Sequence, residues 1–256
     1  MHVHGSSDVQ TQLPLEGLDR SGWVTSPWMG FDTETTGVSP ARDRIVTAAT
    51  VKRPDGIDFD EKSQEDESRS WLADPGVVIP ARATEIHGIT TEVARSKGRP
   101  APEVIEEVNQ ALLEQLESGG AVVVFNASYD LPLLEAESRR HRIATWRERL
   151  GRKTPLILDP LVIDRAVNKY RGGKRTLVAL VEVFGLRLGS AHNATVDAQM
   201  TLDVLRALLT QNPLLQAMTA TDLMAFQREQ HALWAEGFES YLAKRGRTAH
   251  ISREWV

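Results

Sequence analysis

Cysteine is absent from the 256 residues of the chain. This absence excludes disulfides, thiolate metal sites and cysteine nucleophiles, and it fits a reducing compartment. No apolar run reaches the ~18 residues that a membrane-spanning helix needs, and residues 1–8 lack the basic and apolar regions of a secretory signal. These absences predict a soluble, cytoplasmic protein without a membrane partner.

An excess of positive charge is also lacking. The formal net charge is −5, from 30 Lys and Arg against 35 Asp and Glu. Proteins that coat duplex nucleic acid depend on many cations facing the phosphates, so this balance argues against such a protein. With 41% hydrophobic and 25% charged residues, the composition is that of an ordinary globular chain with one main domain.

The expected domain covers residues 28–210 and has a different segment on each side. Residues 1–27 are polar, contain Gly, Ser and Pro and show no sustained period, which predicts a flexible N-terminal arm. Residues 211–256 carry apolar side chains at helical spacing, which predicts a helical C-terminal extension. The extension either packs back on the domain, which the rarity of large exposed apolar patches favours, or presents a face to a protein partner.

Within the domain, the pattern changes from strands to alternating helices and strands. The first part predicts antiparallel strands, with the charged residues 53–68 as a solvated loop or wide hairpin. The later strands are continuously apolar, as expected for strands buried on both faces. The sum is an α/β domain with helices on both sides of a mixed sheet. Strands are predicted at residues 28–33, 45–51, 69–72, 121–125 and 156–158, and helices at 102–118, 128–141, 176–184 and 195–209.

Acidic residues stand in three separated segments. Asp32 and Glu34 are two apart on a predicted strand, so their side chains leave one face ~6.5 Å apart. That separation suits carboxylates beside a metal pair ~3.5–4 Å apart. Taken alone, such a pair is more often two solvated acids on an edge strand, so the other segments have to support the metal interpretation.

The other two segments place acids in the first turns of helices. Asp130 follows an apolar strand, with Ser128 expected as the N-cap of its helix. Asp197 lies one turn into another helix, with Thr195 expected as its N-cap, and His192 precedes it in a loop. A first-turn acid often serves the helix dipole, yet strand ends in α/β sheets are also where ligands collect. The joint occurrence of all these positions favours a metal site over separate coincidences.

These three motifs resemble those of the DEDDh branch of the DnaQ-like 3′→5′ exonucleases. In that family, Asp-x-Glu, an Asp after Asn-Ala-x-aromatic, and His-x4-Asp form three exonuclease motifs, and all five positions are filled here. Residues 84–89 and 158–161 look similar to further family stretches. The chain departs from the pattern at Gly30, where a branched residue is expected, and in the length of the 53–68 insertion.

The resemblance implies a ribonuclease H-like fold, a three-layer α/β/α arrangement around a mixed sheet. It also implies two divalent cations, Mg²⁺ or Mn²⁺, and release of nucleoside 5′-monophosphates. Hard oxygen ligands suit these ions, and two of them would bring the net charge to about −1. The implied general base is His192, and the implied metal ligands are Asp32, Glu34, Asp130 and Asp197.

Substrate contacts are expected outside the five motif positions. His87 either faces the 3′-terminal nucleotide, as the resemblance suggests, or is a helix-end residue satisfied by its neighbours. The basic residues 169–175 precede the motif that carries His192 and are placed to hold a phosphate strand. The candidate substrate-binding residues are Thr35, His87, Asn126 and Lys174.

The expected function is a metal-dependent 3′→5′ exonuclease acting on single-stranded or frayed DNA ends. Two alternatives stay within the class: a proofreading subunit of a DNA polymerase, with the extension as the partner surface, and an exoribonuclease trimming RNA 3′ ends. A nuclease fold without activity that binds nucleic-acid ends or a protein is the alternative from another class. None of the five motif residues is lost, which argues against it.

Overall fold

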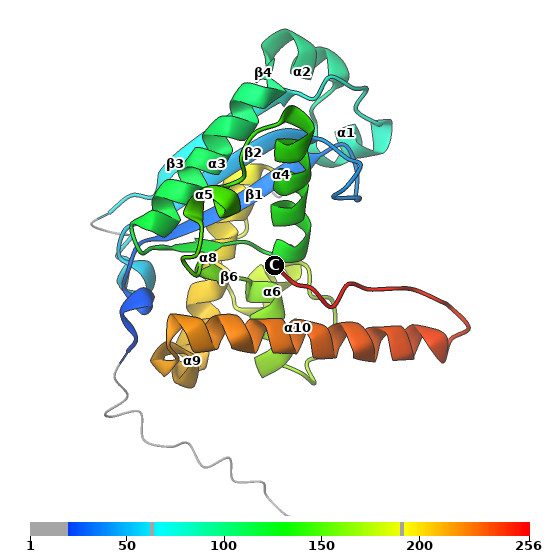
Figure 1. Cartoon of the computed structure of the whole chain (residues 1–256). Helices are drawn as coiled ribbons and strands as arrows, with labels where there is room; N and C mark the ends of the chain where they lie inside the picture. Colours follow the sequence, from blue (N-terminus) through cyan, green and yellow to red (C-terminus); the bar gives the residue numbers. More distant parts are fainter. Residues whose placement is uncertain (1–19, 62–63, 190–191) are drawn as a thin grey trace, which may run out of the picture.

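The computed structural model describes residues 20–61, 64–189 and 192–256 (Figure 1). Their strands form one six-stranded mixed sheet in the order β4-β3-β2-β1-β5-β6. The pairs β1–β2 and β2–β3 are antiparallel, whereas β1–β5 and β5–β6 are parallel. The strands are β1 (Trp28–Thr35), β2 (Ile45–Arg53), β3 (Glu67–Asp74), β4 (Arg99–Pro100), β5 (Ala121–Val123) and β6 (Ile157–Leu158).

Helices cover both faces of the sheet, so the predicted three-layer α/β/α arrangement is confirmed. In Figure 1, α3 and α4 lie in front of the sheet and α8 lies behind it. The helices are α1 (Ala81–His87), α2 (Thr91–Lys97), α3 (Ala101–Glu117), α4 (Ala127–His141), α5 (Trp146–Leu150), α6 (Pro160–Val167), α7 (Leu177–Val183), α8 (Ala194–Gln211), α9 (Pro213–Ala217) and α10 (Ala220–Ala243), with 3₁₀ turns η1 (Gly22–Val24) and η2 (Gly56–Asp58).

Two predicted helix starts were wrong. Helix α4 begins at Ala127, and its N-cap is Asn126, in the left-handed conformation and without a side-chain cap, rather than Ser128. Helix α8 is capped by Asn193, whose side chain accepts from two backbone N–H groups, rather than by Thr195. Asn, Ser and Thr are all common caps, so a polar stretch that offers several does not reveal which backbone turns first.

The charged stretch 53–68 is anchored rather than simply solvated. The side chain of Arg53 is 1% exposed and donates to Asp66 and to Asp203 of α8, each at 2.8 Å. Its guanidinium also lies 4.6 Å from the ring centroid of the buried Phe59. The stretch joins the antiparallel strands β2 and β3, as expected of a wide hairpin. It is not simply a solvated loop, because Arg53 is buried by ion pairs with Asp66 of the stretch itself and with Asp203 of α8.

Residues before the expected domain start at Trp28 are also packed. Trp23 is buried and its indole N–H donates to the Met218 carbonyl at 2.8 Å. The backbone N–H of Ser21 likewise donates to the Gln216 carbonyl at 2.8 Å. Residues 20–27 thus pack on the start of the C-terminal extension, and the rest of the expected arm, residues 1–19, lies outside the described residues.

The C-terminal extension packs back on the domain along the free edge of β6. The side chain of Gln227 on α10 accepts from the Asp159 N–H at 2.8 Å and donates to the Ile157 carbonyl at 3.0 Å. The Ile157 N–H points at the sulfur of Met224. Side chains of α10 therefore replace the next strand and satisfy an edge that would otherwise expose unpaired backbone groups. In the described part of the chain, no helix combines the length and hydropathy needed to cross a membrane.

Candidate active site

Strand β1 carries the first two carboxylates on the face that meets α8. Asp32 and Glu34 share this face with Gly30, because side chains alternate along a strand. A Cβ at Gly30 would lie 2.4 Å from the carbonyl oxygen of Ala198, so α8 rests directly on the strand at this point. The absence of a side chain, which departs from the family pattern, is what lets the start of α8 approach the two acids.

The third carboxylate reaches β1 from the neighbouring parallel strand. Asp130 is 5% exposed in the first turn of α4 and accepts a hydrogen bond from the Thr33 hydroxyl at 2.5 Å. The turn that starts α4 is held by the carboxylate of Asp159, which accepts from the N–H groups of Asn126 at 3.0 Å and Ala127 at 2.9 Å. The left-handed backbone of Asn126, with φ of 66°, is thus supported from a second strand end.

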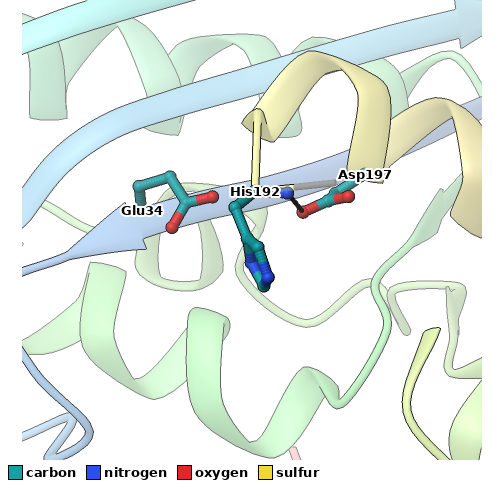
Figure 2. Close-up of side chains that lie close together, drawn as sticks. All are labelled: Glu34, His192 and Asp197. Carbon is teal, nitrogen blue, oxygen red and sulfur yellow. Dashed lines mark hydrogen bonds between the residues drawn. The ribbon is translucent and has the colours of Figure 1, made fainter. Parts of the chain in front are cut away.

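The fourth carboxylate and the histidine lie at the start of α8. Figure 2 shows Glu34, His192 and Asp197 side by side, with the backbone N–H of His192 donating to a carboxylate oxygen of Asp197 at 3.1 Å. One ligand atom from each of these three residues lies within 4.8 Å of the others. His192 is exposed and has a positive φ of 66°. The strand and the helix together therefore place an imidazole beside two carboxylates.

The electrostatics of this cluster favour a bound cation. Burial, followed by the charges of the neighbouring acids, raises the pKa of Asp32 well above its ordinary value. The same causes raise the pKa of Glu34 to about 7, and burial raises the pKa of Asp130 to about 7 despite the Thr33 hydrogen bond. The pKa of Asp197 is also raised, again chiefly by burial. Crowded, desolvated carboxylates of this kind are stabilised in the ionised form by divalent metal.

The residues present fit the metal that the resemblance implies. The four acids are Asp32, Glu34, Asp130 and Asp197, and their carboxylate oxygens are the hard ligands that Mg²⁺ and Mn²⁺ prefer. The imidazole of His192 adds a nitrogen that would also suit Zn²⁺. The arrangement can hold divalent cations beside a group that accepts protons.

Two of the four candidate substrate-binding residues lie at this site. The hydroxyl of Thr35 donates to the Gly37 carbonyl at 2.6 Å and lies 2.8 Å from the hydroxyl of Tyr129. His87 accepts the Ile89 N–H at 3.2 Å through Nδ1, while its buried Nε2 makes no well-formed hydrogen bond among the described residues. Burial lowers the pKa of His87, and the charge of His192 lowers it further. The Nδ1 atom is thus satisfied within its own turn, as expected of a helix-end residue, whereas contact of His87 with a 3′-terminal nucleotide stays a prediction.

Among the described residues, the side chains of the other two candidates, Asn126 and Lys174, make no hydrogen bond or ion pair with the four acids. Asn126 is exposed at the start of α4 and its amide oxygen accepts from the Ser128 hydroxyl at 3.3 Å. Lys174 is exposed in the loop after α6, and the side chain of Arg171 donates to its backbone carbonyl. Among the nearby cations, Arg171 and Arg175 are paired with the buried Asp164.

Sequence reasoning missed the residues that position the acids. Thr33 donates to Asp130 and Asp159 holds the start of α4, and of these two only Asp159 carried a signal, through the family resemblance of the stretch 158–161. Thr33 alternates with the two acids on β1 and so points to α4. A hydroxyl residue between the two acids, on the opposite face of their strand, is the sequence pattern that would have indicated Thr33.

Comparison with known proteins agrees with this geometry. The family model described as exonuclease matches residues 29–205. The chain is 29% identical over 177 residues to the DNA polymerase III PolC-type of Streptococcus thermophilus, covering 67% of this chain and 10% of that protein. It is 30% identical over 198 residues to the PolC-type enzyme of Thermotoga petrophila, covering 77% of this chain and 13% of that protein. The chain thus spans only about a tenth of the length of these relatives.

A solved structure extends the comparison to three dimensions. The zinc ion bound form of the E. coli exonuclease I–ssDNA complex superposes with a TM-score of 0.62 at 20% identity, covering 82% of this chain and 45% of that chain. At this identity, the likeness shows the fold. The family match spans most of the domain that carries the three acidic segments, and the protein belongs to the exonuclease family.

Proposed function

We propose that the protein is a DEDDh-type 3′→5′ exonuclease that hydrolyses phosphodiester bonds at single-stranded or frayed DNA ends and releases nucleoside 5′-monophosphates. The observation that carries the proposal is the meeting of four carboxylates and His192, supplied by three separate segments, at the junction of β1, α4 and α8. Such a cluster costs folding free energy through repulsion, so a role in metal binding is the physical reason for it.

Each residue has a defined part in the proposed reaction. Asp32, Glu34, Asp130 and Asp197 would together hold two Mg²⁺ or Mn²⁺ ions. The ions, when bound, supply Lewis-acid stabilisation of the charge on the attacking and leaving oxygens. His192 accepts the proton of the attacking water, since histidine is the side chain that changes charge near neutral pH.

The substrate is oriented by groups beside this cluster. The buried Nε2 of His87, which makes no well-formed hydrogen bond among the described residues and lies near the Thr35 backbone, is available to a polar atom of the 3′-terminal nucleotide. The hydroxyls of Thr35 and Tyr129 are fixed to each other and to the Gly37 carbonyl. Preorganised groups of this kind position a substrate without further loss of entropy.

DNA is the favoured substrate because PolC-type DNA polymerase III and an exonuclease I–ssDNA complex are among the similar proteins. The PolC similarity also supports the second candidate, a proofreading unit of a DNA polymerase that is bound through the C-terminal extension. RNA is tested beside DNA, because no contact in the described structure identifies a group that would sense the 2′-hydroxyl.

The test is digestion of a 5′-labelled single-stranded DNA oligonucleotide with Mg²⁺ or Mn²⁺, beside an RNA of the same sequence. We expect a ladder that shortens from the 3′ end on DNA, and its loss with EDTA or in Asp32→Ala. Shortening of the RNA alone would assign the exoribonuclease alternative. No shortening of either strand, with retained folding by circular dichroism, would overturn the enzyme and leave the binding module.

A further inference from the structure

A strip of parallel aromatic rings runs along one side of α10, apart from the catalytic carboxylates. The rings of Trp234 and Phe238 are 5.5 Å apart with planes 13° from parallel, and those of Phe238 and Tyr241 are 6.1 Å apart and 12° from parallel. Phe238 is 38% exposed and Tyr241 46% exposed. An exposed run of rings is uncommon on a chain of this composition and calls for an occupant.

The strip forms one wall of a groove, and cations form the other. The groove has a volume of about 380 Å³ and is lined from α6 and its following loop by Arg165, Lys169 and Arg175. Arg175 is held by Asp164, but neither Arg165 nor Lys169 has an ion-pair partner among the described residues. The Arg165 guanidinium lies 3.6 Å over the Trp234 ring. Burial lowers the pKa of Arg165 to about 10, so the group stays charged at neutral pH.

Helix α6 connects this groove to the active site. Its N-cap, Asp159, holds the turn that starts α4, which carries Asp130. With a rise of about 1.5 Å per residue, Arg165 lies roughly 9 Å along the helix from Asp159. A single-stranded DNA whose 3′ end lies at the carboxylates could therefore reach the start of the groove.

We propose that this groove, lined by Arg165, Lys169, Trp234, Phe238 and Tyr241, is a second binding site for single-stranded DNA. Aromatic rings stack on bases of any sequence and cations bind phosphates, which is the combination used by grooves that hold single strands. Arg165 lies over the Trp234 ring and Arg245 lies 4.7 Å over the Tyr241 ring, so a bound base contacts the exposed sides of Phe238 and Tyr241 and its phosphates meet these arginines. The charge of the groove is complementary to a polyanion and not to another basic surface. The site deepens the proposed function and rests on it for the claim that the bound strand is the substrate.

The test separates long from short substrates. Oligothymidylates of about 5 and about 20 nucleotides bracket the ~4–16 nucleotides that such grooves cover. In Phe238→Ala/Tyr241→Ala we expect kcat/KM on the long substrate to fall about 10-fold, since each stacked base contributes ~1–3 kcal/mol, with kcat/KM on the short one unchanged. Binding of the long strand in EDTA, measured by fluorescence anisotropy, should weaken by a similar factor.

Matched control residues lie outside the lining of the groove. Leu214→Ala removes another exposed apolar side chain, from α9, and should leave both substrates unaffected. Lys169→Gln should lower the salt dependence of long-strand binding by about 0.7 in the slope of log Kd against log salt, whereas the exposed Lys153→Gln should not.

Three outcomes would overturn the proposal that the groove binds single-stranded DNA. These are unchanged binding and hydrolysis of the long strand, an equal loss on both lengths, and a change in oligomeric state on sedimentation without loss of DNA affinity, which would assign the strip to self-association. If the wild type degrades neither substrate, only the exonuclease proposal fails. Binding of the long strand in EDTA then still tests whether the groove holds single-stranded DNA.

Discussion

At the scale of single residues, His192 is the group whose removal separates chemistry from metal binding. It contributes an exposed imidazole beside Glu34 and Asp197. In His192→Ala we expect kcat to fall by about 10² or more, the usual loss for a general base, while Mn²⁺ titration calorimetry still detects binding to the carboxylates. The control is His250→Ala, which removes an exposed histidine of the extension. Full activity in His192→Ala would show that another group accepts the proton.

The raised pKa values of the acids predict an unusual pH dependence of stability. Burial raises the pKa of Glu34 and of Asp130 to about 7 in the folded protein, from near ~4 in an unfolded chain. The folded state therefore holds more protons between these values, so stability without metal falls as pH rises across this window. We expect the melting temperature in EDTA to fall from pH 5 to pH 8, by ~2–4 °C for each kcal/mol.

Divalent metal should remove that dependence, because it replaces the protons as the neutralising charge. Melting curves at pH 5, 6, 7 and 8 with Mn²⁺ should show no fall over the same range. Glu34→Gln should flatten the EDTA series, since the variant has no carboxyl to titrate at that position. Parallel curves with and without Mn²⁺ would mean that these carboxylates do not hold the ion.

The five motif residues could be singled out in the sequence because their spacing is imposed by chemistry that recurs. Asp32, Glu34 and Asp197 stand at fixed offsets within short segments, and those offsets are visible in a sequence. The hydrogen bond from Thr33 to Asp130 joins residues 97 apart and leaves no local pattern. Contacts of that kind depend on how the strands are ordered, which the sequence alone did not indicate.

At the scale of elements, the packing of α8 on β1 decides where Asp197 lies. In Gly30→Ala the new methyl group would meet the Ala198 carbonyl, so the helix must move. We expect a loss of about 1–3 kcal/mol in unfolding free energy, as for other overpacked sites, together with a lower kcat. The measurements are urea unfolding and initial hydrolysis rates.

The matched control is Gly172→Ala, because a Cβ at Gly172 would meet no atom within 4 Å. This variant should stay within ~0.5 kcal/mol of the wild type. If Gly30→Ala had the stability and activity of the wild type, the close approach of α8 to β1 would be contradicted. The sequence showed Gly30 only as a departure from the family pattern, and its reason required the neighbouring helix.

The predicted elements were most accurate where periodicity was long. The helix expected at residues 102–118 corresponds to α3, Ala101–Glu117. The seven-residue α1 and α2 were not among the predicted elements. Short helices depend on tertiary contacts and on turns such as the left-handed Gly88 that ends α1. Local pattern therefore predicts the frame of the fold better than its connections.

At the scale of the whole molecule, the C-terminal extension packs on the exonuclease domain. It covers the edge of β6 through Gln227, and the indole N–H of the buried Trp255 donates to Asp159 at 3.1 Å. Asp159 is also the residue that holds the start of α4. The extension is thus linked, through one carboxylate, to the helix that carries Asp130.

This link predicts that a substitution in the extension impairs a reaction at the start of α4, where Asp130 lies. In Trp255→Ala we expect a loss of about 3–5 kcal/mol in unfolding free energy, typical of a buried Trp, and a lower kcat on a short oligonucleotide. Trp255→Phe keeps most of the packing and loses the hydrogen bond, which is worth about 1 kcal/mol, so its losses should be smaller. Tyr170→Ala, at a ring that is 93% exposed, is the control that should change neither. If Trp255→Ala lowers stability but leaves kcat unchanged at a temperature where the variant is folded, the extension stabilises the domain without positioning Asp130.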